Sequence, residues 1–593
     1  MNTLQDLESM VEDLRSELEA ASGKRICDTV LYNVKIVDVY SERIYDGSVA
    51  IHNGRIIAVN PDEHIRAHEM IDGKGQYAVP GFIDAHAHIE TTLLTPMALG
   101  DLVAPWGTTS MFVDAMEIAN VAGIDGLNSL VNSSSCLPFR MYLEIPSRVP
   151  TMPGFETTGG TLEVSEVEQL FENDVVISLG ELDPSKILNI KEDYLQKILC
   201  ALLNGRICNG HAIGLNCQEL NVYATGHIAD DHECVSGDDL LNRLRVGIGV
   251  MLREGSSERN TADLIKCIIA NGLPTDSFMF CTDDKHANDI AHEGHISYNI
   301  QLAINLGMPA ITAIKIASLN AARHFHMEHD LGAIAPGRLA DIVLLPSLNK
   351  ITPTMVIKNG KVVFNGEKKY SSVNANYSHE LMNTVKLPSN ICADDFRIIA
   401  KGSKALCRVI GMISDQIINE ERQIWMDIQD GEIKQDTNRD ILKLTVVERY
   451  GKTHNVMSSF VQGFGLKKGA IASSVSHDHH NIVVVGCNDN DMLIAVRELE
   501  KSQGGFTAVA DGKIIGIMPL PLAGLMSTKS ADTVLEQMDK INETVIKLGC
   551  NMKAPFMSLS FISLPTVPQL GLTDMGMIDV LGHRFIEPII KVK

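Results

Sequence analysis

The first apolar positions of the chain recur at helical spacing. They lie three or four residues apart among acidic and polar residues: Leu4, Leu7, Met10, Val11, Leu14 and Leu18. This spacing places apolar side chains on one face of a helix, and Gly23 follows as a stop signal. The sequence therefore predicts that the chain opens with an amphipathic helix that docks on another surface.

Two stretches with the pattern of β-strands flank the middle of the chain. Residues 29–38 and 49–59 have the pattern of strands, and the second is interrupted at Asn53-Gly54, a dipeptide favoured by tight type I′ hairpin turns. The same pattern returns beyond residue 340, where the apolar run 356–358 turns at Asn359-Gly360. We expect both stretches to contribute to one small β-sandwich.

Between these stretches, from about residue 78 to about residue 330, short apolar runs that end in polar clusters alternate with helical stretches. Such alternation over about 250 residues predicts a parallel barrel, whose chemistry lies at the C-terminal ends of its strands. Beyond about residue 390 the pattern mixes strands and helices, as in a separate α+β domain.

We therefore expect an α/β fold with a TIM-like (β/α)8 barrel, flanked by a small β-sandwich built from both sides of the barrel, plus a C-terminal α+β domain. The first predicted unit, residues 1–75, holds the opening helix and the first part of the sandwich. Residues 76–335 form the barrel and residues 336–375 return to the sandwich. Residues 390–593 form the C-terminal domain.

The composition narrows the class of protein. The 593 residues are 45% hydrophobic and 21% charged, which is typical of a globular chain and excludes a disordered one. With 51 Lys and Arg against 74 Asp and Glu, the net charge of -23 argues against partners with phosphate backbones or anionic lipids. Twelve cysteines without CxxC pairs, a charged start and no apolar run of about 18 residues indicate a cytoplasmic protein without disulfides.

The strongest chemical signal is the pair His86 and His88, just after an apolar run that ends at Ile83. Residues two apart in an extended segment point to the same side, so both imidazoles can reach one metal at a strand end. Two histidines at this spacing also occur on surfaces without any function, but the preceding strand favours the metal.

Four later segments each add a polar donor after an apolar stretch. Taken singly, each donor would be structural: a capping Asp, a core His or a surface Glu. Together with the histidine pair they supply six ligands in barrel order, enough for two metals bridged by a carboxylate. These donors are Glu181, His211, His232 and Asp283, with Glu233 and Asp284 beside two of them.

Several motifs resemble the amidohydrolase superfamily and, most closely, its adenine deaminase branch. Residues 79–90 (VPGFIDAHAHIE) are similar to the superfamily's first-strand motif, and residues 331–343 resemble its return to the sandwich. The resemblance to the branch extends over nearly the whole chain, including the C-terminal domain. It rests on residues 117–121, 252–256, 281–284, 291–295, 476–484 and 519–527.

The resemblance implies a binuclear metal centre. It assigns the first metal to His86 and His88 and the second to His211 and His232. Glu181 would bridge the two metals where many relatives use a modified lysine, and Asp283 would complete the site. Oxygen and imidazole ligands suit Mn(II), Fe(II) or Zn(II) and disfavour a thiolate metal. Among these, the resemblance favours manganese or iron.

The implied reaction is the hydrolytic deamination of adenine to hypoxanthine and ammonia, by attack of an activated water at C6. Two metals lower the pKa of a shared water from about 15.7 toward about 7. Asp283 is expected to take a proton from this water. Glu233 would either pass a proton to the ring nitrogen or orient His232. Asp284 would contact the substrate or hold Asp283 in place.

Substrate contacts are expected from Glu117, Arg148, Arg253 and Glu254. Two positions near the pocket depart from the branch: Ala115-Met116 replaces a usual Pro-His, and Arg148 replaces a small Cys. A guanidinium there suits an anionic or carbonyl-rich ligand if it faces the pocket, and a surface salt bridge is the alternative. These departures spare the expected ligands but weaken the assignment of the heterocycle.

Two further histidine groups have open roles. His292 and His295 lie three residues apart, and we expect a structural or substrate-loop role for them rather than a third metal. The run 476–481 contains His477, Asp478 and two more histidines. It could bind a metal, close over the barrel mouth or form a polar loop between strands.

Two other functions remain open beside adenine deamination. One is an amidohydrolase that acts on another heterocyclic amidine or cyclic amide, and the other is a catalytically silent homologue that binds a purine. A nucleic-acid base deaminase is excluded because the chain lacks the Pro-Cys-x-x-Cys half of the signature of those enzymes and is acidic. The expected partners are a small purine base, water and further copies of the chain, without nucleic acid or membrane.

Overall fold

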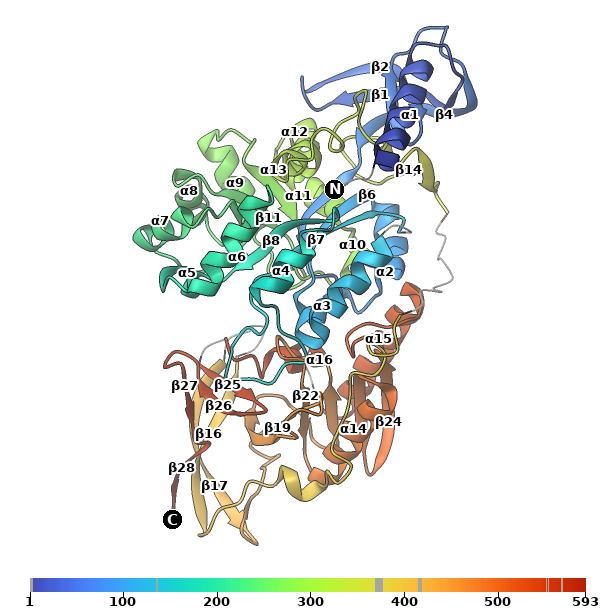
Figure 1. The fold of residues 1–593 in the computed structure, drawn as a ribbon. Coiled ribbons are helices and arrows are strands. Elements are labelled where there is room, and N and C mark those ends of the chain that lie inside the picture. Colours follow the sequence, from blue (N-terminus) through green and yellow to red (C-terminus); the bar gives the residue numbers. More distant parts are fainter. Residues whose placement is uncertain are drawn as a thin grey trace.

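The computed structural model describes residues 4–134, 137–367, 377–413, 419–550, 552, 554–566 and 569–593. The chain has mixed α/β content in three parts, which follow one another from top to bottom in Figure 1. These are a β-sheet with the first helix, a central part in which helices surround parallel strands, and a C-terminal part. The predicted boundary at residue 375 lies outside the described residues.

The first sheet takes strands from both sides of the central part. Its strand order is β15-β14-β13-β4-β1-β2-β3, so strands that precede and follow the central part pair side by side. Both expected hairpin turns are present, because Asn53 and Gly54 join β2 to β3 and Asn359 and Gly360 join β14 to β15, all four with positive φ. The strands are β1 (Cys27–Asp38), β2 (Arg43–His52), β3 (Arg55–Val59), β4 (Ala67–Pro80), β13 (Ile342–Leu345), β14 (Met355–Lys358) and β15 (Lys361–Phe364).

Helix α1 (Leu4–Ala21) is the predicted opening helix, and it contacts the sheet through its polar and small residues. Ser16 Oγ lies 2.9 Å from His52 Nε2, and Ala20 is fully buried. The apolar stripe instead faces solvent, with Leu7, Leu14 and Leu18 at 55%, 56% and 62% exposure. The helix is therefore confirmed, but the apolar face on which docking was expected does not contact the sheet.

The central part contains two parallel sheets, a five-stranded one in the order β5-β6-β7-β8-β9 and a three-stranded one in the order β10-β11-β12. Isolated parallel bridges join Cys208 to Ile228 and Ala87 to Asp283, so both ends of the two sheets are linked. Every residue of β5 is buried, as expected of a parallel strand covered on both faces. The strands are β5 (Phe82–Ala87), β6 (Thr108–Asp114), β7 (Arg140–Pro146), β8 (Val176–Leu182), β9 (Ile207–Gly210), β10 (Asp230–Asp231), β11 (Gly249–Arg253) and β12 (Phe278–Cys281).

Helices lie outside these strands (Figure 1). They are α2 (Pro96–Val103), α3 (Met116–Ser133), α4 (Val164–Leu170), α5 (Pro184–Leu188), α6 (Glu192–Leu203), α7 (Cys217–Thr225), α8 (Gly237–Arg245), α9 (Thr261–Asn271), α10 (Ala287–Glu293), α11 (Ile296–Asn305), α12 (Ala310–Lys315) and α13 (Ala321–His324). Shorter helical turns are Ile89–Thr92, Ala104–Trp106, Ile316–Asn320 and Ala393–Phe396.

The C-terminal part is built on a ten-stranded sheet in the order β18-β17-β16-β20-β19-β22-β21-β23-β24, with β28 beside β16, and on a three-stranded sheet β25-β26-β27. The first of its strands are β16 (Lys404–Met412), β17 (Asn419–Gln429), β18 (Glu432–Ile433), β19 (Ile441–Val447), β20 (Val456–Gln462), β21 (Ala470–Ser473) and β22 (Ile482–Gly486). The others are β23 (Gly505–Ala510), β24 (Lys513–Pro519), β25 (Leu570–Thr573), β26 (Gly576–Asp579), β27 (Arg584–Ile586) and β28 (Ile589–Val592). Its helices are α14 (Asp489–Ser502), α15 (Ala531–Lys547) and α16 (Pro555–Phe561).

The C-terminal part packs directly against the central part. Thr157, between β7 and α4, donates to Asp574 from its amide at 3.0 Å and from its hydroxyl at 2.7 Å. Asn481 Nδ2 donates to the Thr157 carbonyl at 2.8 Å. A single hydrophobic core runs through both parts, so the two pack as one body; its members include Leu94, Val149, Val475 and Leu522.

The pH dependence of stability should report on Glu156, beside this contact. Burial raises the pKa of Glu156 from 4.5 to about 8, although its carboxylate accepts a hydrogen bond from the Met152 amide. The unfolded chain then releases the proton at lower pH than the folded chain does. Stability should therefore fall as pH rises from 4.5 to about 8, by up to about 1.4 kcal/mol per pH unit.

Chemical denaturation at several pH values measures this slope. Glu156→Gln keeps the size and the acceptor oxygen but cannot ionise, so its slope should be smaller. The exposed Glu172→Gln is the control and should keep the wild-type slope. Equal slopes in wild type and Glu156→Gln would contradict the expectation.

Candidate metal centre

His86 and His88 present one ring nitrogen each to a common space. They lie at the end of β5 and are almost fully buried. His86 Nδ1 lies 2.9 Å from Glu144 Oε2. His88 Nδ1 lies 2.8 Å from the Asp114 carbonyl oxygen, an acceptor, so this nitrogen carries the proton. If His86 likewise donates to Glu144, both rings keep an Nε2 lone pair for a metal.

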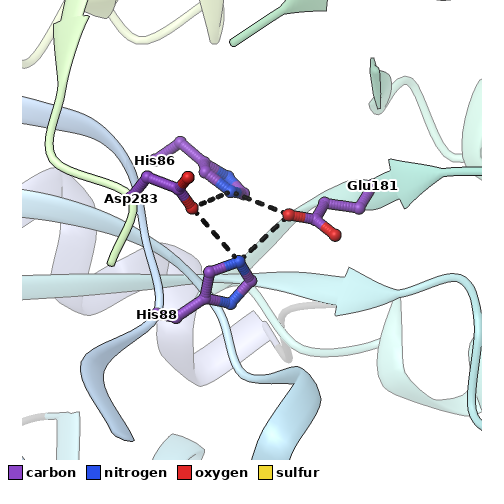
Figure 2. Close-up of side chains that lie close together, drawn as sticks. All are labelled: His86, His88, Glu181 and Asp283. Atoms are coloured by element: carbon purple, nitrogen blue, oxygen red, sulfur yellow. Dashed lines mark hydrogen bonds and ion pairs between the residues drawn. The ribbon is translucent and has the colours of Figure 1, made fainter. Parts of the chain in front are cut away.

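Glu181, on β8, faces His86 and His88 (Figure 2) and also lies close to His211 and His232. Its Oε1 is 3.0 Å from His88 Nε2 and 3.3 Å from His86 Nε2. The same oxygen is 3.5 Å from His232 Nε2 and 3.9 Å from His211 Nδ1. One carboxylate oxygen is therefore shared by two pairs of imidazoles, as a bridging ligand between two metals requires.

Arg148 holds the other oxygen of this carboxylate by donating to Glu181 Oε2. Burial by itself would raise the pKa of Glu181, but Arg148, His211 and His88 hold it well below its ordinary value. Arg148 thus faces the site, and the surface salt bridge considered from sequence is wrong, because the arginine side chain is only 13% exposed.

His211 and His232 complete the second pair. His211 follows β9 and His232 follows β10, and their Nδ1 and Nε2 atoms lie 3.4 Å apart. Together with Glu181 they offer three ligand atoms within 4.8 Å of one another. The two parallel strands end side by side, which explains why residues 21 positions apart meet here.

Asp283, after β12, joins the first pair. Its Oδ1 lies 3.5 Å from His88 Nε2 and 3.8 Å from His86 Nε2. The backbone holds it there, because its amide donates to the His86 carbonyl at 3.0 Å and its carbonyl accepts from the His88 amide at 3.3 Å. Asp283 Oδ2 accepts from Arg253 Nη1 at 2.9 Å.

The donor set fits a metal. His86 Nε2 is buried without a hydrogen-bond partner, and a buried imidazole nitrogen of this kind normally has one. His86, His88, Glu181 and Asp283 offer four ligand atoms within 4.8 Å of one another. The ligands are nitrogen and oxygen only, which suits the divalent first-row metals.

Arg253 ties two carboxylates together beside this centre. It donates to Glu233 Oε1 at 2.6 Å and to Asp283 at 2.9 Å. Glu233 Oε1 also lies 3.4 Å from His232 Nε2. Burial would raise the pKa of Glu233, but His211 and Arg253 hold it well below its ordinary value, so this carboxylate is ionised.

The other expected site residues differ in their surroundings. Asp284 is half-buried, and desolvation together with the charge of Asp283 raises its pKa to about 7. Glu117 accepts from His477 and His480 of the C-terminal part and is held by both. Glu254 is not brought to the metal ligands by any of its described contacts; its carboxylate lies 3.7 Å from Arg259 Nη1.

Some residues of the site were missed in the sequence. Glu144 and the Asp114 backbone, which orient His86 and His88, come from β7 and β6. The signal that could have found Glu144 is a carboxylate inside the apolar run 141–145, since an unpaired buried charge is costly. The other histidine pair is separated: His295 Nε2 lies 3.2 Å from Asp84, whereas His292 is exposed.

Known families match both long parts of the chain. The model described as "Amidohydrolase family" matches residues 77–363, and "Adenine deaminase C-terminal domain" matches residues 416–584. An adenine deaminase of Desulforamulus reducens is 54% identical to this chain. The match covers 98% of this chain and 99% of the relative. An adenine deaminase 2 of Carboxydothermus hydrogenoformans is 38% identical, covering 96% and 98%.

Other matches are more distant. An adenine deaminase of Bacillus velezensis is 36% identical over 97% of this chain and 99% of its own. The solved structure of a zinc-bound adenosine deaminase from Xanthomonas campestris is 15% identical, with a TM-score of 0.44 and coverage of 57% of this chain and 94% of its own. Two family models and near full-length identity to several curated relatives agree: this chain belongs to the adenine deaminase family of the amidohydrolases.

Proposed function

We propose that the protein hydrolyses adenine to hypoxanthine and ammonia at a binuclear metal centre. The observation that carries the proposal is the position of Glu181 Oε1, which lies within 3.9 Å of one ring nitrogen from each of four histidines. Membership of the adenine deaminase family, at up to 54% identity over almost the full length, supports adenine as the substrate.

The proposal includes the architecture that holds this centre. The two parallel sheets close through the bridges at Cys208 and Ala87 into a TIM-like (β/α)8 barrel of residues 76–335. The flanking sheet folds over one core into a β-sandwich of residues 1–75 and 336–375, supported by shared core residues such as Ile36, Ile56 and Ile342. Residues 390–593 form the C-terminal domain.

Two metals would be held by six side chains. In this assignment one metal takes His86 and His88, the other takes His211 and His232, Glu181 bridges them and Asp283 completes the first site. Mn(II) or Fe(II) is proposed, with Zn(II) as the alternative, since all three accept imidazole and carboxylate ligands. When bound, the metals would lower the pKa of water to about 7 and so supply a nucleophile at neutral pH.

The chain's own groups then move the protons. Water adds to C6 of the ring, and Asp283 accepts the proton that the water loses. Asp284 delivers a proton to the neighbouring ring nitrogen, N1, whereas Glu233, held ionised by His211 and Arg253, orients His232. The proton on Asp283 passes to the amino group, which leaves as ammonia when the C6–N bond breaks. The C6 hydroxyl returns its proton to Asp284 as its oxygen becomes the carbonyl oxygen of hypoxanthine. Arg253, which contacts Glu233 and Asp283, keeps both carboxylates in place.

Turnover of adenine by metal-loaded protein tests this function. Protein reconstituted with Mn(II) or Fe(II) under reducing conditions should consume adenine, seen as loss of its absorbance, and release one ammonia per adenine. Removal of the metal with a chelator should abolish turnover, and reloading should restore it.

A bound metal with no turnover of adenine would favour an amidohydrolase for another cyclic amidine or amide. Protein that cannot be loaded with metal would favour the catalytically silent purine-binding homologue. Either result would contradict the proposed function.

We also propose a cytoplasmic protein that works on a small purine base. The described cysteines are free thiols, as expected in a reducing compartment. The net charge of -23 opposes nucleic acid and anionic lipid as partners. Among the described helices we find no span of sufficient length and hydropathy to traverse a bilayer.

A homo-oligomer is part of the proposal, and α1 supports it. Val11, Leu14 and Leu18 follow the spacing of a coiled-coil seam and are 47%, 56% and 62% exposed. If a second copy covers this face, Leu14→Glu should lower the molar mass measured by light scattering. Leu203→Glu, at an 86% exposed position on α6, should not. A monomeric wild type, or an unchanged mass in Leu14→Glu, would contradict the oligomer.

A further inference from the structure

A loop of the C-terminal part lies at the edge of the metal centre. It joins β21 to β22 through residues 474–481. His477 is 4% exposed and Asp478 is 6% exposed. The loop is held by its own backbone, because the His477 amide donates to the Ser560 carbonyl at 3.0 Å and the His480 amide donates to the Ser476 carbonyl at 2.7 Å.

Glu117, on α3 of the central part, connects to this loop through two histidines. His477 Nδ1 lies 3.0 Å from Glu117 Oε1, and His480 Nε2 contacts Glu117 Oε2. These three residues also offer ligand atoms close enough to hold a metal ion. The protonation of His480 distinguishes a third metal from a hydrogen-bonded group.

His480 carries its proton on the nitrogen that faces Glu117. Its Nδ1 accepts a hydrogen bond from the Ser476 amide at 3.2 Å, so a neutral ring must hold the proton on Nε2. Burial lowers the pKa of His480, which keeps the ring neutral. Nε2 therefore donates to Glu117 and has no lone pair for a metal. We interpret the group as a carboxylate that holds two histidines.

His477 is left with one free polar atom. Since its Nδ1 donates to Glu117, Nε2 is the remaining ring nitrogen, and it is buried without a hydrogen-bond partner. The ring stacks on Phe561 of α16, at 4.6 Å between centroids and 15° between planes, which fixes its orientation. Buried polar atoms are nearly always paired in the working molecule, so Nε2 calls for a partner.

His477 is close enough to Asp284, one of the proposed proton carriers, for their charges to interact. Asp284, the neighbour of Asp283, in turn interacts with His88. Burial would lower the pKa of His477, but Glu117, then Asp284 and Asp478, raise it to about 9. At neutral pH the ring is therefore an imidazolium, and Nε2 is a hydrogen-bond donor.

We propose that His477 is a substrate contact: its Nε2–H donates to a ring nitrogen of the purine, so that the C-terminal part supplies one wall of the binding site. This inference rests on the proposed function, because it takes a purine as the ligand. A purine offers unprotonated ring nitrogens as acceptors, and an imidazolium donor is matched to them. Glu117 and His480 are then positioning residues that hold His477.

Two variants of His477 test the contact. His477→Phe keeps an aromatic ring to stack on Phe561 but removes the donor, and kcat/KM for adenine should fall about 10- to 100-fold. His477→Gln places an amide donor near the position of Nε2 and should recover part of the loss. His479→Asn is the control in the same loop. Asparagine keeps an acceptor near the position of His479 Nδ1, which accepts from the Asn481 amide at 3.0 Å, and the ring has no described contact with Glu117, so kcat/KM should change less than about 3-fold.

Inhibition by 1-deaza-, 3-deaza- and 7-deazaadenine separates contact from packing. Each analogue lacks one ring nitrogen. His477→Phe should therefore weaken inhibition by two of the analogues. Inhibition by the analogue that lacks the accepting nitrogen should stay unchanged. Equal weakening of inhibition by all three analogues would overturn the contact. So would equal losses of kcat/KM in His477→Phe and His479→Asn, both measured on folded, metal-loaded protein. A third equivalent of metal that disappears in His477→Phe would also overturn it.

Failure of the contact differs from failure of the proposed function. If the wild type does not turn over adenine, the proposed function fails. Calorimetric titration of adenine into metal-loaded wild type and His477→Phe still decides the contact, because equal dissociation constants would refute it.

Discussion

Replacing Glu181 by glutamine should remove both metals and nearly all deaminase activity. The variant loses the charge of the oxygen that lies 3.0 to 3.9 Å from four imidazole nitrogens. Residues that only orient a ligand typically cost 10- to 100-fold in metal affinity, so we expect a bridging ligand to cost at least about 100-fold. Elemental analysis and the rate of adenine loss measure the two effects.

Glu181→Gln also leaves Arg148 buried without its anionic partner, which can cost about 3 to 5 kcal/mol of stability. A second variant, Glu181→Asp, keeps the negative charge on a shorter side chain. Comparison of the two variants separates loss of stability from loss of the carboxylate that bridges the metals. The exposed Glu172→Gln controls for the substitution itself. Full metal occupancy with normal turnover in folded Glu181→Gln would refute the bridging assignment.

The second large effect is expected for Asp283→Asn. Asparagine preserves the size and can still accept from Arg253, but it cannot take a proton from water. Removal of a general base typically lowers the rate about 10²- to 10⁴-fold, so kcat should fall in that range while KM changes little. Metal loss should be smaller than in Glu181→Gln, because Asp283 Oδ1 lies 3.5 and 3.8 Å from two imidazole nitrogens, whereas Glu181 Oε1 lies within 3.9 Å of four.

Steady-state kinetics of metal-loaded Asp283→Asn measure the loss of kcat, and its metal content measures the loss of metal. Asp263→Asn, whose side chain is 73% exposed on α9, is the control and should behave as wild type. A variant that retains wild-type kcat would exclude Asp283 as the proton acceptor. Loss of both metals together with activity would instead make it mainly a structural ligand.

The parts of the site that could be predicted share one property: their signal is local. His86 and His88 are two residues apart on one strand, so strand geometry alone places them on the same side. Glu181 and Asp283 each follow an apolar run, and the ends of parallel strands meet at one edge. This reasoning needs no knowledge of which strands are neighbours in space.

The parts that could not be predicted depend on contacts between distant segments. The contact between Glu117 and His477, 360 residues away in the sequence, was not expected. Arg148 was weighed as a surface residue and instead contacts Glu181 across two strands of the same sheet. Neither partner can be read from composition or spacing, because each pair forms only when different segments of the chain pack together.

By itself, the sequence determined the helices, strands and hairpin turns, the family and the identity of the six candidate ligands. These follow from periodicity, turn chemistry and motifs, all of which act over a few residues. Only the tertiary structure decided that the apolar face of α1 is exposed, that Arg148 holds the Glu181 carboxylate and that a C-terminal histidine contacts Glu117 of the central part. The physical reason is that burial and hydrogen-bond partners belong to the packed chain and not to any local stretch of it.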